Sequence, residues 1–120
     1  MEHLNGLIQL TRQGKFLEAI ERFYSADATM QENLDAPRVG LRALLDNERN
    51  VLARVPDIHV VRVGWVMVDG DKSAINWVFG WTNPDGAKIE LDEIAYQEWK
   101  DGKIVRERFY YDPAQRSKPV

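Results

Sequence analysis

Three carboxylates in this sequence stand among aromatic and apolar residues, in a pattern that suits acid–base chemistry. The first is Glu107, in the stretch KDGKIVRERFYYDP. If this stretch is a β-strand, Glu107 shares one face with Val105, Phe109 and Tyr111, because side chains alternate between faces. Burial in an apolar cavity raises the pKa of a carboxyl group, so that it can exchange a proton near neutral pH. Glu107 is therefore the first candidate catalytic residue.

Glu32 and Asp92 are the other two candidate catalytic residues. Glu32 ends the stretch YSADATMQE, and Asp92 lies in the alternating stretch AKIELDEIAYQEWK. Each carboxylate also has an ordinary explanation. Glu32 stands where a strand passes into a loop, and Asp is seldom fully buried, so solvated side chains account for both. Glu107 fits equally well as a buried acceptor satisfied by Tyr96 and an arginine.

The strands that must position these groups follow one another in the second half of the chain. Four runs alternate or are rich in β-branched residues, and each connection between them carries an Asp-Gly pair, which is a strong hairpin signal. The runs are 58–68, 72–82, 87–100 and 103–111. The pattern predicts an antiparallel meander of four strands.

Helices are predicted in the first half. Helical spacing of apolar residues indicates helices over 4–11, 16–24 and 39–55, the last ending before Pro56. A short strand is predicted over 28–32. Helices ahead of a long antiparallel sheet define an α+β fold, and 120 residues without a repeat or linker predict one domain, 1–120.

The hairpin turns predict which residues share a face. With Asp101 and Gly102 at the turn, Tyr96 faces Glu107. A four-residue NPDG loop places Trp77 opposite Asp92. The face predicted to lie under the helices then carries Ser73, Ile75, Trp77, Phe79, Trp81, Asp92, Ile94, Tyr96, Glu107, Phe109 and Tyr111. Its predicted ligand-binding residues are Trp77, Phe79, Trp81, Tyr96, Phe109 and Tyr111, although tryptophans at such positions are also ordinary core residues.

The opposite face mixes charged and apolar side chains. It is predicted to carry Leu91, Trp99 and Arg106. Because exposed apolar area on a sheet marks an interface, we expect a homodimer to form through this face.

Composition narrows the function classes. The net charge is −3, which disfavours nucleic acid as a partner because phosphate binding needs a basic surface. There is no Cys, and His3 and His59 are far apart in sequence, so no metal site or other cofactor is expected. No apolar run is long enough for a membrane span. The start of the chain lacks the basic segment of a signal peptide, so a cytoplasmic location is expected.

With its stretches FYSADATMQEN and DGKIVRERFYYDP, the chain resembles the SnoaL-like branch of the nuclear transport factor 2-like superfamily. The resemblance implies a cystatin-like cone: a curved sheet wrapped round helices, an internal cavity, and frequent dimers through the sheet. In the steroid isomerases of this superfamily, the position of Glu32 holds the proton-shuttling carboxylate. Their oxyanion-hole positions fall on Leu7 and Ile94, which cannot donate hydrogen bonds. In the SnoaL-type cyclases an inward His and Asp fall on Glu107 and Phe109.

Two functions from different classes follow. The first is binding of an apolar, oxygen-bearing small molecule in an aromatic cavity, with isomerase, cyclase or dehydratase chemistry by acid and base. The alternative is a non-catalytic dimeric interaction or scaffold module of the same fold. Fold-level resemblance alone does not separate them.

Overall fold

Three α-helices and a six-stranded sheet make up the fold. The computed structural model describes residues 1–120 throughout. The helices are α1 (Glu2–Arg12), α2 (Phe16–Phe23) and α3 (Leu41–Arg54), and a 3₁₀ helix, η1 (Pro113–Ser117), lies near the end of the chain. The strands are β1 (Tyr24–Glu32), β2 (Arg38–Val39), β3 (His59–Asp69), β4 (Lys72–Thr82), β5 (Lys88–Lys100) and β6 (Lys103–Tyr110).

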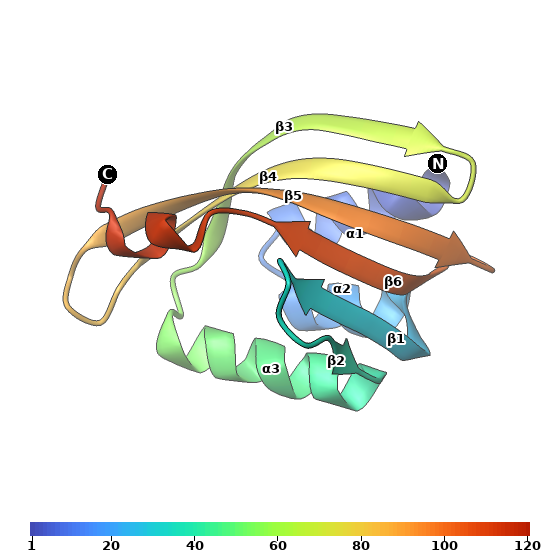
Figure 1. Cartoon of the computed structure of the whole chain (residues 1–120), viewed down its shortest axis with the longest axis horizontal. Coiled ribbons are helices and arrows are strands. Elements are labelled where there is room, and N and C mark those ends of the chain that lie inside the picture. Colours follow the sequence, from blue (N-terminus) through green and yellow to red (C-terminus); the bar gives the residue numbers. More distant parts are fainter.

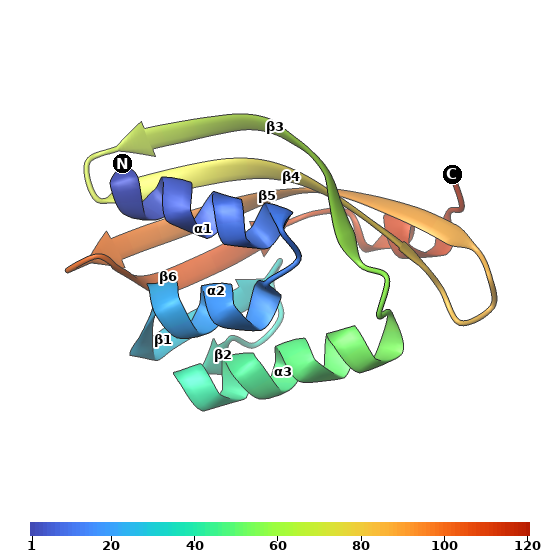
Figure 2. The ribbon, with the colours of Figure 1, turned by 180° about the vertical axis from the view of Figure 1, so that it is seen from behind.

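The helices cover one face of the sheet. The buried residues of α2 are Phe16, Ala19, Ile20 and Phe23, a spacing that places all four on one side of a helix. Figure 2 shows α1 and α2 lying against the sheet, with α3 beside α2 and the β1–β2 edge. Leu44, the buried residue of α3, joins the main apolar core between these helices and the sheet.

The sheet is curved and open. Its strand order is β2-β1-β6-β5-β4-β3, and every neighbouring pair is antiparallel except β1 and β6, which run parallel. The pairings of β3, β6 and β1 contain register irregularities. Such bulges bend a strand and increase its twist, and the long strands arch over the helices (Figure 1).

The predicted fold class is confirmed. The four-stranded meander exists as β3 to β6, and its last hairpin turns at Asp101 and Gly102, whose φ angles are 52° and 76°. Three features were not predicted: β1 begins at Tyr24 directly after α2, it pairs with β6, and both β2 and η1 are present. Residue patterns inside one segment do not reveal a parallel partner that lies far along the chain.

The predicted register was wrong for β5. Trp77 pairs with Glu93 instead of Asp92, and Gln97 instead of Tyr96 pairs with Glu107. The faces predicted for β4 and for β6 from Arg106 onward are correct, whereas Val105 is a bulge residue and Ile104 lies in the core. A shift of one residue turns every side chain of a strand to the other face, so β5 alone is reversed.

Two local features cause this shift. The connection after β4 has five residues, because Thr82 pairs with Lys88 and the amide of Asn83 donates to the carbonyl of Ala87 (2.8 Å). At the other end, Trp99 pairs with Ile104 but Glu98 pairs with Arg106, which leaves Val105 as the extra residue of a bulge. Each feature moves β5 by one position against a neighbour.

The reversal changes the predicted surfaces. Asp92 and Tyr96 lie on the outer face of the sheet, and Leu91 and Trp99, which were predicted on that face, are 4% and 6% exposed in the core. Of the three predicted interface residues only Arg106 lies on the outer face, where it pairs with Glu98 (2.8 Å). None of the helices combines the length and the apolar composition that crossing a bilayer requires.

Candidate functional site

A cavity of about 380 Å³ lies between the inner face of the sheet and the helices. Most of its lining residues are apolar, and they come from all three α-helices, from β1, β4, β5 and β6, and from η1. Such a mostly apolar space with a few polar groups is typical of small-molecule sites. The polar groups that decide its chemistry are Glu93, Glu107, Glu48 and Glu32.

Glu107 is held by two hydrogen bonds. Tyr24, the first residue of β1, donates its hydroxyl to Oε1 of Glu107, and Nε2 of Gln97 donates to Oε2 at 2.7 Å. Glu107 is 2% exposed and Gln97 is fully buried. Burial raises the pKa of Glu107, while the hydrogen bonds from Tyr24 and Gln97 lower it and Glu48 raises it, and the outcome is a pKa of about 7.

Glu93 is a buried inward carboxyl group without a partner in the protein. It is 7% exposed, it lines the cavity, and no group of the protein donates a hydrogen bond to its side chain. Every polar side-chain atom that is completely enclosed has a hydrogen-bond partner, so the carboxyl oxygens of Glu93 reach the cavity space. Burial, with the nearby charge of Glu107, raises the pKa of Glu93 to about 8.

The two acids lie at different depths of the cavity. Gln97 is directly opposite Glu107, and Glu93 is four residues further along β5, which separates the backbone positions by about 13 Å along the strand. At pH 7 the carboxyl group of Glu93 is mostly neutral and can donate a hydrogen bond. Glu107 titrates near this pH, so the cavity holds one proton donor and one proton acceptor.

Aromatic rings form the wall beside these acids. Trp77 and Phe79 are stacked with their ring centroids 5.4 Å apart, and Phe16 of α2 meets Phe79 edge-on at 6.3 Å. Trp81 belongs to a second apolar cluster with Leu91, and its indole nitrogen donates to Asn83 (2.8 Å). Planar rings at fixed positions suit a flat apolar ligand.

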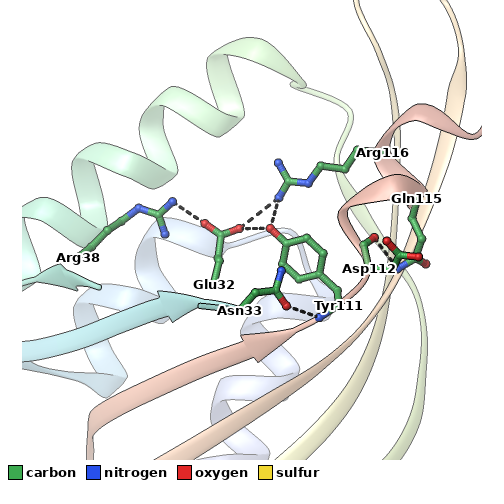
Figure 3. A network of polar contacts seen from close by, with 7 residues as sticks. All are labelled: Glu32, Asn33, Arg38, Tyr111, Asp112, Gln115 and Arg116. Atoms are coloured by element: carbon green, nitrogen blue, oxygen red, sulfur yellow. Dashed lines mark hydrogen bonds and ion pairs between the residues drawn. The ribbon is translucent and has the colours of Figure 1, made fainter. Parts of the chain in front are cut away.

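A charged cluster lies at the solvent side of the cavity, which we call the mouth cluster: Glu32, Arg38, Tyr111 and Arg116 (Figure 3). Glu32 accepts hydrogen bonds from Arg38 (2.5 Å), from the Tyr111 hydroxyl (2.6 Å) and from Arg116 (3.1 Å). Burial raises the pKa of Glu32, but these hydrogen bonds and the two arginine charges outweigh it, so the pKa is lowered. Glu32 is therefore an ionised structural anchor at neutral pH.

The mouth cluster ties the end of the chain to the sheet. Arg116 of η1 also makes a cation–π contact with Tyr111, with its guanidinium carbon 5.1 Å from the ring centroid. Beyond the end of the β5–β6 ladder, Gln115 accepts from the Asp92 backbone amide (2.9 Å) and donates to the Asp92 carbonyl (3.1 Å). The η1 segment thus bridges β1 and β5.

The structure separates the predicted site residues into groups. Glu107, Trp77, Phe79, Trp81, Phe109 and Glu32 line the cavity. Tyr111 lies in the mouth cluster. The other two residues, Asp92 and Tyr96, face away from the cavity: the Asp92 carboxylate accepts from Asn76 (2.6 Å) and the Tyr96 hydroxyl donates to Glu98 (2.9 Å).

Three inward polar residues, Glu93, Gln97 and Tyr24, were missed. Glu93 was missed because the predicted register placed β5 with the wrong face inward. Ile89, Leu91 and Trp99, on the same face as Glu93, are apolar and indicate that this face points inward. Tyr24 was treated as the end of a helix. No group of three or more His, Asp or Glu side chains lies together in a way that would hold a metal ion.

Comparison with known proteins identifies the family. The SnoaL-like domain model matches residues 7–107, so the chain belongs to the SnoaL-like family. No protein with a curated description matches the sequence.

Solved structures agree with this assignment. A proposed SnoaL-like polyketide cyclase from Mesorhizobium loti is 26% identical, with 92% of this chain and 97% of that chain covered and a TM-score of 0.77. A Xanthomonas campestris protein with a cystatin-like fold is 17% identical, with 96% and 92% covered and a TM-score of 0.83. TerC, co-crystallised with polyporic acid, is 16% identical, with 92% and 89% covered and a TM-score of 0.78.

The raised pKa of Glu93 predicts a pH-dependent difference in stability between the wild type and the Glu93→Gln variant. In the unfolded chain Glu93 ionises above its ordinary pKa of 4.5, whereas in the folded protein it stays neutral up to about pH 8. Its contribution to stability is therefore complete below 4.5 and is lost as the pH rises towards 8. The Glu93→Gln variant does not titrate, so at pH 8 it should be more stable than the wild type by on the order of 4 kcal/mol.

Urea unfolding at several pH values measures this difference. The gain should disappear below pH 4.5, where both forms of residue 93 are neutral. Glu90→Gln on the outer face of the same strand is the matched control and should show no such trend. A Glu93→Gln effect that is constant with pH would contradict the raised pKa.

Proposed function

We propose that the cavity binds an apolar small molecule that carries a carbonyl oxygen, and that Glu93 and Glu107 act on it as acid and base. The observation that carries this proposal is the unpartnered carboxyl group of Glu93, 7% exposed and facing an aromatic cavity. Its oxygens reach the cavity space and no group of the protein donates to them. They are therefore free to bond a ligand oxygen.

The proposed chemistry is proton transfer next to a carbonyl group. Neutral Glu93 donates a hydrogen bond to the carbonyl oxygen, which stabilises the negative charge that develops there. The Glu107 carboxylate removes a proton from the adjacent carbon, and an enol or enolate forms as the electron pair moves to oxygen. Return of the proton from Glu107 to a different carbon completes isomerisation. Exchange is completed when solvent first replaces the proton held by Glu107 and the new one is delivered to the same carbon, so neither outcome needs an external reductant or oxidant.

Two comparisons support this class of ligand. The Mesorhizobium loti relative is described as a SnoaL-like polyketide cyclase, and TerC, which shares the fold, was co-crystallised with polyporic acid. For the present chain the aromatic wall of Trp77 and Phe79 supplies the flat apolar surface, and the two acids supply the polar contacts.

Exchange of a ketone's acidic carbon-bound protons tests the proposal without the natural substrate. β-Tetralone is a suitable probe because it combines an aromatic ring with a carbonyl group and readily enolised protons. In deuterated buffer at pH 7 the protein should accelerate loss of its proton NMR signal beside the carbonyl. Glu107→Gln should reduce the protein-dependent rate at least 100-fold, within the range for a general base.

Matched variants separate the role of the acids from that of the fold. Glu93→Gln keeps an N–H donor but loses the acid, and should lower the rate less than Glu107→Gln. Glu90→Gln on the outer face should leave it unchanged. If Glu107→Gln retains the wild-type rate while remaining folded, Glu107 is not the base.

The outer face of the sheet supports a second proposal, a homodimer that serves as an interaction scaffold. Ile94 and Tyr110 are directly opposed across β5 and β6 and are 38% and 42% exposed. This apolar pair, flanked by Arg108, whose guanidinium carbon lies 4.7 Å from the Tyr110 ring centroid, replaces the Leu91 and Trp99 contact that the sequence predicted. Exposed apolar area on a sheet favours association.

Charge substitutions on the two faces of β5 test this interface. Ile94→Glu should give a folded monomer in sedimentation, where the wild type sediments as a dimer. Leu91→Glu should instead unfold at lower urea, because it places a carboxylate in a core position with 4% exposure. A wild-type monomer, or an Ile94→Glu dimer, would refute the proposed interface.

A further inference from the structure

A chain of buried hydrogen bonds ends at Glu107. The indole nitrogen of Trp99 donates to Oγ of Ser73 at 2.8 Å. Ser73 donates to Oε1 of Gln97 at 2.7 Å, and Nε2 of Gln97 donates to Oε2 of Glu107 at 2.7 Å. Trp99 and Ser73 are 6% and 3% exposed. The chain runs across three neighbouring strands, β4, β5 and β6.

The first member fixes the direction of the chain. An indole N–H can only donate, so Ser73 must accept from Trp99. The single hydroxyl proton of Ser73 is then free to donate, and it meets the oxygen of the Gln97 amide. This orients the amide so that its N–H group points at Glu107.

The reversed amide would leave a group unpaired. If the Gln97 oxygen faced Glu107, its N–H group would face Ser73, which already accepts from Trp99. The hydroxyl proton of Ser73 would then have no acceptor in this chain, and an unpaired buried polar group is costly. Glu107 would also have to be protonated to satisfy the amide oxygen.

We propose that Trp99 is a positioning residue for Glu107: through Ser73 and Gln97 its indole N–H holds the glutamate as a hydrogen-bond acceptor, ready to take up a proton. Trp99 belongs to the apolar core and does not line the cavity. Its influence on Glu107 passes entirely through the two intervening side chains.

The other groups that face Glu107 determine how much this orientation matters. Tyr24 of β1 donates to it, and Glu48 of α3 and Glu93 of β5 are the nearby carboxylates. The buried residues of α1 and α2 include no titratable group. Burial and the charge of Glu48 favour the protonated form of Glu107, so the donors from Tyr24 and Gln97 are what favour the ionised form.

Titration of the Glu107 carboxyl carbon by carbon-13 NMR tests this inference on the free protein. Glu107→Gln identifies the signal. In Trp99→Phe, the Ser73 hydroxyl can turn its proton to the side that the indole N–H occupied and donate it to a water there. Ser73 can then accept from Gln97 with no group left unpaired, the amide can turn, and the titration midpoint of Glu107 should rise by about one pH unit. Ser73→Ala removes one oxygen from the middle of the chain and should raise the midpoint in the same direction.

Trp81→Phe is the matched control. It also removes a buried indole N–H, but one that donates to Asn83 outside the chain, so the Glu107 midpoint should stay unchanged. An unchanged midpoint in Trp99→Phe and Ser73→Ala would overturn the inference, as would an equal shift in Trp81→Phe. If Trp99→Phe does not fold, Ser73→Ala decides; if that variant also fails to fold, the chain is structural and the inference is wrong.

A catalytic role for this hydrogen-bond chain rests on the proposed function, but the result of the titration does not. A raised midpoint together with no exchange of β-tetralone would leave the positioning of Glu107 standing and remove the proposed chemistry. An unchanged midpoint together with rapid exchange of β-tetralone would overturn the positioning of Glu107 and leave the proposed chemistry standing.

Discussion

The facing of β5 is the constraint on which the rest of the site depends. The five-residue connection after β4 and the bulge at Val105 offset this strand by one position from both neighbours. The offset points Glu93 into the cavity and Gln97 at Glu107, and it turns Asp92 and Tyr96 outward. Because side chains alternate strictly along a strand, no smaller adjustment would bring these polar groups inside.

The two inward carboxyl groups of β5 and β6 are buried in different ways. Glu107 receives donors on both oxygens, and these offset part of the desolvation that burial imposes. Glu93 receives none, so desolvation dominates and its pKa is the higher of the two. The same scaffold thus holds an acid and a base in one cavity, which is the arrangement that proton transfer requires.

Much of the fold could be predicted from the sequence because it depends on patterns within short segments. Alternation in β4 and β6 and the Asp-Gly turns gave the meander and the inward position of Glu107, Trp77 and Phe79. The apolar residues Ile89, Leu91 and Trp99 also favour the observed face of β5, and this evidence outweighs an assumed loop length. The polar residues Glu93 and Gln97 obscured the alternation at the two positions that matter most for function.

Other parts of the site could not be predicted from local pattern. Tyr24 reaches Glu107 only because β1 lies parallel to β6. These strands are about eighty residues apart, and the residue pattern of neither strand indicates that they pair. The mouth cluster likewise joins Glu32 and Arg38 to Tyr111 and Arg116 of the chain's last segment. Such sites depend on long-range contacts, and the family resemblance supplied the cavity but not these partners.

The central claim is that Glu93 is an unpartnered acid inside the cavity. Carbon-13 NMR titration of its side-chain carboxyl carbon in the free wild-type protein, assigned with Glu93→Gln, tests this claim most directly. The account predicts a midpoint of about 8, raised chiefly by burial. A midpoint near the ordinary value of 4.5 would show that Glu93 is solvated or paired, and would contradict the account.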